Sequence, residues 1–263
     1  MSYYEKKYIQ YLLIEGCKGR EFAALGGKNA NIRALNVKCL FDFNRALKLM
    51  NWEKHKQNLY VSCARLKNIP KFTFSPKKRS SETQPWYRKE YDRSILYYDL
   101  FMDFDKSEED SWEDLIKEVK ILKEYLDEYE VPYYLLFSGK KGFQIIIPGD
   151  YLDIEKIEKG TIFPHKKIVE NIKKMLDLKF LDLANNGVNS RLRKLPYSLV
   201  GEKIAFPLSD SDLDNFHIEK MKIDYIIGNI GLIRRRNLER FLNLNLKQKR
   251  INVENFIKVF DFK

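Results

Sequence analysis

The order of hydrophobic and polar positions divides the chain into two kinds of segment. Strict alternation is typical of a half-buried strand, and an apolar repeat of about 3.6 residues is typical of a helix. Strands are expected at 58–66, 94–105, 133–138, 143–148, 179–183 and 203–208, and helices at 3–15, 39–50, 111–130 and 165–178. This mixture predicts an α/β (α+β) protein.

The clearest predicted helix is 111–130. Seven apolar side chains fall on one of its faces: Trp112, Leu115, Ile116, Val119, Leu122, Leu126 and Tyr129. Ser111, followed three residues later by Asp114, matches the pattern of a capping box at its start. Strands precede and follow this helix, which indicates a crossover, and the tight SGKKG turn adds an antiparallel neighbour. We therefore expect a mixed, largely antiparallel sheet flanked by helices.

The rest of the chain supplies a hairpin, a loop and a helical end. Residues 20–38 predict a hairpin around Gly26–Gly27, and 75–93 predict a long loop because the segment is polar and contains Pro76 and Pro85. From residue 211 the pattern is mainly helical. The predicted organisation is a catalytic core over 1–210, with a helical C-terminal part over 211–263 packed on it.

The composition also indicates which kind of molecule the protein binds. The 263 residues are 44% hydrophobic, enough for a sizeable core, and 48 Lys+Arg against 37 Asp+Glu give a net charge of +11. Such an excess favours polyanions such as nucleic acid or nucleotides, although a merely soluble Lys-rich protein has the same composition. No stretch approaches the ~20 apolar residues of a membrane span, and no signal-peptide pattern is present.

Three isolated cysteines indicate neither a disulfide framework nor a zinc site. We therefore expect free thiols and a reducing compartment, which is the cytoplasm. We expect the protein itself to be associated with the nucleoid and to have no membrane partner. The loop predicted at 75–93 interleaves cations with aromatic residues, which suits a single-stranded nucleic acid as well as it suits an ordinary solvated loop. Its candidate nucleic-acid-binding residues are Lys77, Lys78, Arg79, Trp86 and Arg88.

The first candidate for chemistry is the sequence FMDFD. Within a strand, Asp103 and Asp105 point to the same face, with Cα atoms about 6.6 Å apart. Two such carboxylates repel one another unless a cation lies between them, and hard oxygen ligands suit Mg²⁺ or Mn²⁺. The alternative is a strand end whose aspartates are simply solvated.

Two more stretches follow in order. SGKKG at 138–142 offers two lysines on a glycine turn, which suits a phosphate, although it also suits a plain surface turn. Further on, Asp182 precedes a basic segment with Arg191, Arg193 and Lys194, which ends in a Pro-Tyr-Ser turn. Taken singly, each of these patterns is ordinary.

Together, the three stretches resemble the archaeo-eukaryotic primase superfamily. The catalytic motifs of that superfamily are a DxD strand, an SGxxGxH hairpin and an aspartate leading into a basic R/K-x-P-x-S segment. Here they stand as Asp103–Asp105, Ser138–Gln144 and Asp182–Ser198, and the resemblance covers about residues 20–200. It implies a primase-type catalytic core and a template-dependent nucleotidyltransferase, which makes primers or also extends them.

The resemblance also implies roles for individual residues. Two Mg²⁺ or Mn²⁺ ions would be bound by Asp103, Asp105 and Asp182, without zinc. The nucleotide would be bound by Ser138, Gly139, Lys140, Lys141, Gly142, Gln144, Arg193 and Lys194. Implied partners are a single-stranded DNA template, nucleoside triphosphates, and a large primase subunit or another replication or repair protein.

One position departs from the motif. Gln144 replaces the usual histidine, so a hydrogen-bond donor is kept while the capacity for positive charge is lost. This change leaves open a binding protein for single-stranded nucleic acid with weak or no activity. The clustered carboxylates also leave open a metal-dependent nuclease.

Overall fold

The computed structural model describes residues 3–25, 32–49, 58–69, 83–153, 165–183, 192–231 and 251–252. The chain divides into two compact units. Unit 1 comprises Met1–Tyr98 and Asn189–Ser198, and unit 2 comprises Asp99–Val188 and Leu199–Lys263. Both units combine helices with mostly antiparallel strands, which confirms the predicted α/β class.

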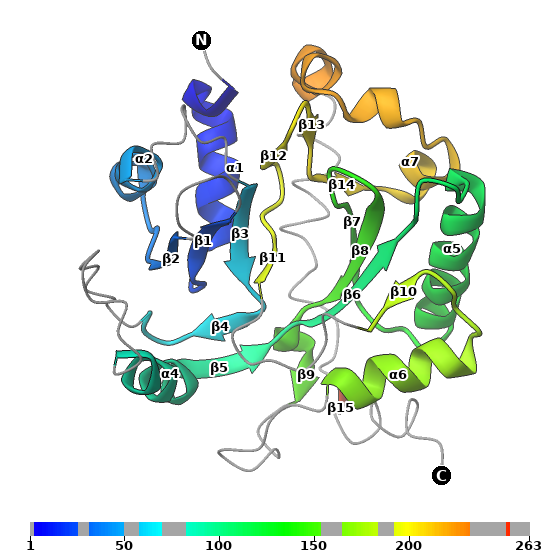
Figure 1. Ribbon diagram of the computed structural model, residues 1–263, viewed down its shortest axis with the longest axis horizontal. Helices are drawn as coiled ribbons and strands as arrows, with labels where there is room; N and C mark the ends of the chain where they lie inside the picture. The colour runs from blue at the N-terminus through cyan, green and yellow to red at the C-terminus, as the bar shows by residue number, and fades with distance from the viewer. Residues whose placement is uncertain are drawn as a thin grey trace. The chain divides into compact units, whose positions relative to one another are not determined.

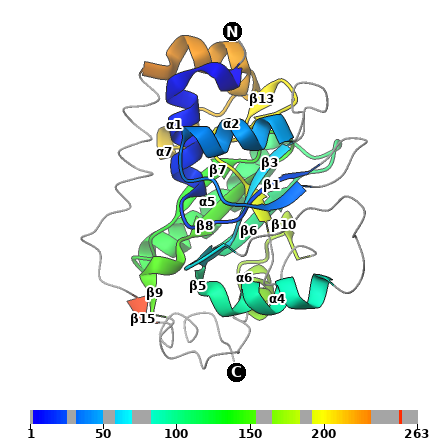
Figure 2. The same ribbon diagram turned by 90° about the vertical axis from the view of Figure 1, so that its left-hand side faces the viewer.

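Unit 1 is built around a four-stranded antiparallel sheet of order β11-β3-β1-β2 (Figure 1). Figure 2 shows β1 and β3 of this sheet from another side. Its helical elements are η1 (Tyr3–Glu5), α1 (Lys7–Cys17), α2 (Leu40–Leu49) and α4 (Thr83–Ser94). Its strands are β1 (Phe22–Leu25), β2 (Ile32–Leu35), β3 (Asn58–Ser62), β4 (Ala64–Leu66), β5 (Ile95–Tyr98) and β11 (Leu192–Lys194). The predicted hairpin over 20–38 is confirmed by the antiparallel pair of β1 and β2.

The core of unit 1 forms where α1 and α2 meet this sheet. The ring of Phe43 in α2 lies 6.2 Å from Phe22 in β1 and 6.3 Å from Tyr4, measured between ring centroids. Phe22 and Phe43 are fully buried, as are Ile9 and Leu13 of α1. Burial of these side chains supplies the main favourable free energy of the unit.

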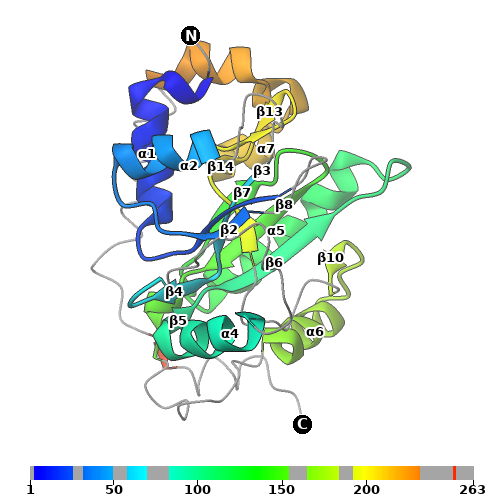
Figure 3. The same ribbon diagram turned by 60° about the vertical axis from the view of Figure 1, so that its left-hand side comes forward.

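The loop predicted at 75–93 is wrong over its second half, where α4 forms and leads into β5 (Figure 3). Pro85 is the third residue of α4, in the first turn, where a backbone N–H has no partner within the helix. Proline is therefore compatible with the helix at this position. Strand β5 then pairs with β4 in an antiparallel ladder.

Unit 2 contains a five-stranded sheet of order β10-β6-β8-β7-β14, with α5 and α6 beside it (Figure 1). Its helical elements are η2 (Gly149–Tyr151), α5 (Trp112–Glu128), α6 (His165–Met175), α7 (Asp210–Asp214) and η4 (Ile218–Met221). Its strands are β6 (Leu100–Asp105), β7 (Tyr134–Phe137), β8 (Gly142–Ile147), β9 (Leu152–Asp153), β10 (Leu181–Asp182), β12 (Leu199–Val200), β13 (Lys203–Ile204), β14 (Phe206–Leu208) and β15 (Ile251–Asn252).

The predicted crossover is confirmed. Strand β8 is antiparallel to both β6 and β7 and lies between them, so β6 and β7 run in the same direction and α5 connects them. The Ser111 hydroxyl accepts the Asp114 N–H at 3.0 Å, as the capping pattern predicts. Leu115, Val119 and Leu122 are buried on the inner face of α5.

The two faces of this sheet differ in chemistry. One register row crosses all five strands and is apolar: Leu181, Phe104, Phe143, Phe137 and Phe206. Trp112 of α5 covers this row, with its ring centroid 5.7 Å from that of Phe143. The adjacent row contains Asp182, Asp103, Gln144, Leu136 and Pro207. Because successive side chains of a strand alternate, this second row faces away from α5.

Two predicted strands are each divided in two. The segment 94–105 is interrupted at Asp99, whose buried Oδ1 atom accepts the Gly149 N–H at 3.1 Å. The segment 58–66 is interrupted at Cys63, between β3 and β4. The first interruption lies where the chain passes from the ladder of β5 with β4 to the ladder of β6 with β8.

Beyond residue 210, helical segments alternate with turns. Residues 223–231 are helical in addition to α7 and η4, whereas β15 forms a parallel pair with β9. The proposed boundary near residue 210 stays a prediction. No helix in the described part of the chain is long and apolar enough to cross a membrane.

Candidate functional site

Three carboxylates meet on the polar face of the five-stranded sheet. Asp103 in β6 is the register partner of Asp182 in β10 on one side and of Gln144 in β8 on the other. Directly opposite residues have Cβ atoms about 4.5–5.5 Å apart on the same face. Asp105, two residues along β6, shares this face, and all three aspartates are half-buried. Strand pairing thus brings together the predicted acidic residues, although they lie about 80 positions apart in the chain.

An ammonium group lies among these acids. Lys141 Nζ is 3.0 Å from Asp105 Oδ2. The hydrogen bond to Asp105 raises the pKa of Lys141, and the charges of Asp105, Asp103 and Asp182 raise it further. The Lys141 side chain is 54% exposed, so it can leave without disturbing the core. Lys140 is exposed and forms no ion pair with any described residue.

Both glycines of the SGKKG turn are required by its geometry. A Cβ atom at Gly142 would lie 1.8 Å from the Phe104 carbonyl oxygen, because β6 and β8 approach closely there. Gly139 has φ +90°, and a Cβ atom there would lie 2.5 Å from Val200 Cγ2. The Ser138 N–H closes the turn by donating to the Gly142 carbonyl at 2.9 Å. The amide of buried Ser138 is therefore used within the turn, and the two lysines stand at its tip.

Gln144 is directed at the carboxylates. Its Nε2 atom donates to Asp103 Oδ1 at 3.3 Å, and its side chain is buried. Because an ionised carboxylate only accepts hydrogen bonds, Asp103 selects the amide orientation with Nε2 toward it. In this structure the donor that could have contacted a phosphate contacts Asp103 instead.

The three carboxylates are chemically suitable ligands for a hard divalent cation. Three carboxylates offer oxygen ligands, and the Lys141 ammonium stands where a positive charge is favourable. Among the described residues, no three His, Cys, Asp or Glu side chains are already close enough to hold a metal ion. Ion binding would therefore require the aspartate side chains to turn toward one another and Lys141 to move.

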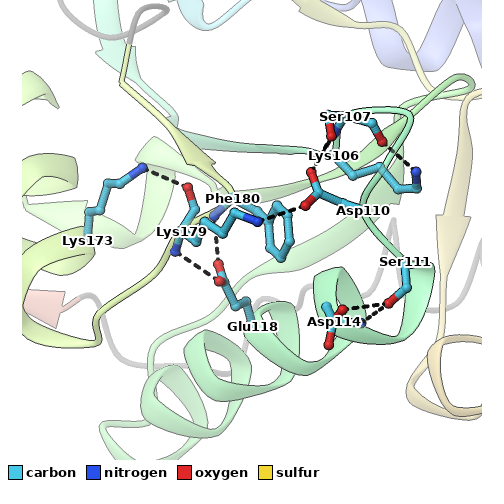
Figure 4. A network of polar contacts seen from close by, with 9 residues as sticks. All are labelled: Lys106, Ser107, Asp110, Ser111, Asp114, Glu118, Lys173, Lys179 and Phe180. Carbon is cyan, nitrogen blue, oxygen red and sulfur yellow. Dashed lines mark hydrogen bonds and ion pairs between the residues drawn. The ribbon is translucent and has the colours of Figure 1, made fainter.

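The segment that leads into β10 is bound by charged side chains from the helices of unit 2 (Figure 4). The carboxylate of Glu118 in α5 accepts the Lys179 N–H at 2.9 Å and the Phe180 N–H at 2.8 Å. Lys173 Nζ in α6 donates to the Lys179 carbonyl at 3.0 Å. The same atom also donates to the Leu181 carbonyl at 2.5 Å. Glu118 and Lys173 could not be recognised from the sequence, because both occupy ordinary polar positions of amphipathic helices.

A third contact involves the side chain of Lys179. Its Nζ atom lies 2.7 Å from Asp110 Oδ1, in the loop that follows β6 (Figure 4). Hydrogen bonds from Lys179 and Ser107 hold the pKa of the Asp110 carboxyl well below its usual range. The segment is thus connected to α5, α6 and the loop after β6.

Two predicted nucleotide-binding residues lie in unit 1, on strand β11. Lys194 Nζ donates to the Tyr60 hydroxyl at 2.7 Å and lies 4.2 Å from the centroid of that ring. Arg193 is only 4% exposed. Burial raises the pKa of the Cys17 thiol, and the nearby charges of Arg193 and Arg20 oppose that rise. Within unit 1, Arg193 is therefore a buried charge, and Lys194 is held by an aromatic partner.

The predicted nucleic-acid-binding residues are described only in part. Lys77, Lys78 and Arg79 lie outside the described residues, as does Arg191. Trp86 and Arg88 fall in the helix α4, but their side chains are outside the described part of the structure. Their proposed contacts with nucleic acid stay predictions.

Comparison with known proteins identifies the fold. No sequence model of a protein family matches the chain, and no curated protein matches it in sequence. The polymerase domain of ligase D from Mycobacterium tuberculosis, solved in complex with DNA, matches with a TM-score of 0.54 and 15% identity, over 88% of each chain. Primase RepB′ matches with a TM-score of 0.41 and 10% identity, over 89% of this chain and 69% of its own, which is too distant to inform the fold. The chain therefore has an α/β fold similar to that of the ligase D polymerase domain.

Proposed function

We propose that this protein is a template-dependent nucleotidyltransferase of the archaeo-eukaryotic primase type. It would join nucleoside triphosphates on a single-stranded DNA template, as a primase or a primase–polymerase. The observation that carries the proposal is that Asp103, Asp105 and Asp182 lie on one face of the same sheet, in a chain whose fold is similar to that of a polymerase domain. The net charge of +11 is consistent with nucleic-acid and nucleotide partners.

The acidic and the basic residues of the site would have different roles in the reaction. The three aspartates would hold Mg²⁺ or Mn²⁺, which when bound activates an attacking hydroxyl and neutralises the triphosphate and the departing pyrophosphate. Lys140 and Lys141, at the tip of the turn, would contact the triphosphate. Gln144 would orient Asp103 through its amide N–H. Catalysis would then consist mainly of positioning and charge stabilisation.

The test is synthesis on a single-stranded template with Mn²⁺ and labelled nucleotides, with and without a primer. We expect extended products from the wild type and none from Asp103→Asn or Asp105→Asn, while both variants still bind single-stranded DNA. Asp224→Asn is the matched control, because Asp224 is an exposed aspartate on the helix 223–231 of the same unit. Full activity of either site variant would refute the assignment of the carboxylates.

One observation favours a second candidate, a non-catalytic binding protein for single-stranded nucleic acid. Lys141 pairs with Asp105, so one of the three negative charges is already balanced without a bound ion. DNA binding without any product in the same assay would support this candidate. Shortening of the labelled template would indicate a metal-dependent nuclease instead.

A further inference from the structure

Strand β10 is too short to place Asp182 by its own ladder. It consists of Leu181 and Asp182 and lies at the edge of the sheet, where β6 is its one partner among the described strands. Strands of globular proteins usually have 3–10 residues, so a two-residue strand needs other support. We propose that Glu118 and Lys173 are positioning residues that hold Asp182 beside Asp103. This proposal rests on the proposed function for its catalytic consequence.

Glu118 fixes the N–H groups of the segment. Its two carboxylate oxygens each accept one backbone N–H, from Lys179 and from Phe180. Such charge-assisted hydrogen bonds are roughly twice as strong as neutral ones, and a two-point contact also fixes orientation. On the other side, the Phe180 carbonyl accepts the Asp105 N–H at 3.1 Å. The chain immediately before Asp182 is therefore held between α5 and β6.

Lys173 fixes the carbonyl groups of the same segment. Its single ammonium donates to the carbonyls of Lys179 and Leu181, the residues on either side of Phe180. An anion from α5 thus binds the amides, and a cation from α6 binds the carbonyls. Figure 4 shows Glu118 at the two amides and Lys173 at the Lys179 carbonyl. The ion pair of Lys179 with Asp110 adds a third contact, but it contributes little because the Lys179 side chain is exposed to water.

Both side chains contact the backbone of residues 179–181, and they would act on the reaction only through Asp182. In metal sites, loss of a group that orients a ligand typically weakens metal affinity by about 10–100-fold. Glu118→Gln keeps one acceptor and places an amide N–H against a backbone N–H. Lys173→Met keeps most of the side-chain length and removes both donated bonds. Matched controls are Glu124→Gln and Lys174→Met, exposed positions on the same two helices.

Hydrogen exchange without metal tests the anchoring itself. We expect amide exchange over residues 179–182 to be at least about tenfold faster in Glu118→Gln and in Lys173→Met, and unchanged in the two controls. Equal exchange in all five proteins would overturn the proposal. Because two helices supply the anchors, the Lys173 variant decides the question if the Glu118 variant does not fold.

Mn²⁺ affinity, measured by electron paramagnetic resonance, tests the consequence for Asp182. We expect it to fall about 10–100-fold in both anchor variants, with the wild-type value kept in the controls. Faster exchange with unchanged Mn²⁺ affinity would show a merely structural role and refute the positioning of Asp182. A wild-type protein that binds no Mn²⁺ would refute the proposed metal site, while the exchange experiment would still decide whether the segment is anchored.

Discussion

Replacing Lys141 by methionine should strengthen the binding of a divalent ion. The ammonium group now lies 3.0 Å from Asp105 Oδ2, so a metal ion at the three aspartates has to displace it. Methionine keeps an unbranched side chain of similar reach but carries no charge. The variant therefore removes a competing cation and leaves the carboxylates in place.

The expected gain in Mn²⁺ affinity depends on how exposed the Lys141 side chain is. Lys141 is 54% exposed, so water screens the pair and its full Coulomb energy does not apply. Pairs of this kind are worth about 0.2–1 kcal/mol, which corresponds to about a 1.4- to 5-fold change in an equilibrium constant. We expect Mn²⁺ to bind more tightly by a factor in this range. The gain should shrink at high ionic strength, since salt already weakens the pair in the wild type.

The assay is a Mn²⁺ titration without nucleotide, followed by electron paramagnetic resonance. Lys140→Met is the matched control, because Lys140 neighbours Lys141 but forms no ion pair with a described residue. Removing that charge should change affinity less. Weaker Mn²⁺ binding in Lys141→Met, or an equal gain in both variants, would show that Lys141 does not compete for the site.

Four further predictions address stability and the nucleotide. Gly142→Ala should destabilise the fold in urea by about 1–3 kcal/mol or more, because the methyl group meets a backbone carbonyl, whereas Gly228→Ala, with open space in a helix, should be neutral or stabilising. Ser111→Ala should cost about 0.5–2 kcal/mol by loss of the α5 cap, and an unchanged urea midpoint would contradict this. The lowered pKa of Asp110 contributes stability above its unfolded value of about 3.9 and loses it as the pH falls below that, so Asp110→Asn should flatten the acid limb of an unfolding titration. Gln144→His should tighten nucleotide binding when the imidazole is protonated, and no change would place residue 144 away from the phosphates.

The elements with strong local patterns could be predicted from the sequence. The helix α5 carries its own periodicity and its own cap, and the hairpin of β7 and β8 is marked by a turn that only glycines allow. The break at Asp99 could not be predicted, because it depends on the different pairing partners of β5 and β6, which the alternation of residues within 94–105 does not reveal. The start of α4 was missed because Pro85 was interpreted as a breaker, although proline is tolerated in a first helical turn.

The residues of the candidate site, too, could be predicted from the sequence only in part. The order of the motifs, through their resemblance to a known family, predicted that Asp103, Asp105 and Asp182 lie together. Periodicity alone treats Glu118 as a solvent-facing position, and its partners lie 61 and 62 residues away in the chain. A hydrogen bond between a side chain and a backbone group far away in the sequence leaves no local pattern in either segment. Only the folded structure reveals it.

The two register rows of the five-stranded sheet have a consequence for how such a protein can evolve. The apolar row that faces α5 sets the register of the strands. The same register aligns Asp182, Asp103 and Gln144 on the opposite face. A slip by one residue would bury the acids and expose the aromatic rings, so selection for folding alone preserves the alignment of the polar row. The identity of the polar residues is not protected in this way. Substitutions at polar positions such as residue 144 can therefore accumulate while the fold persists.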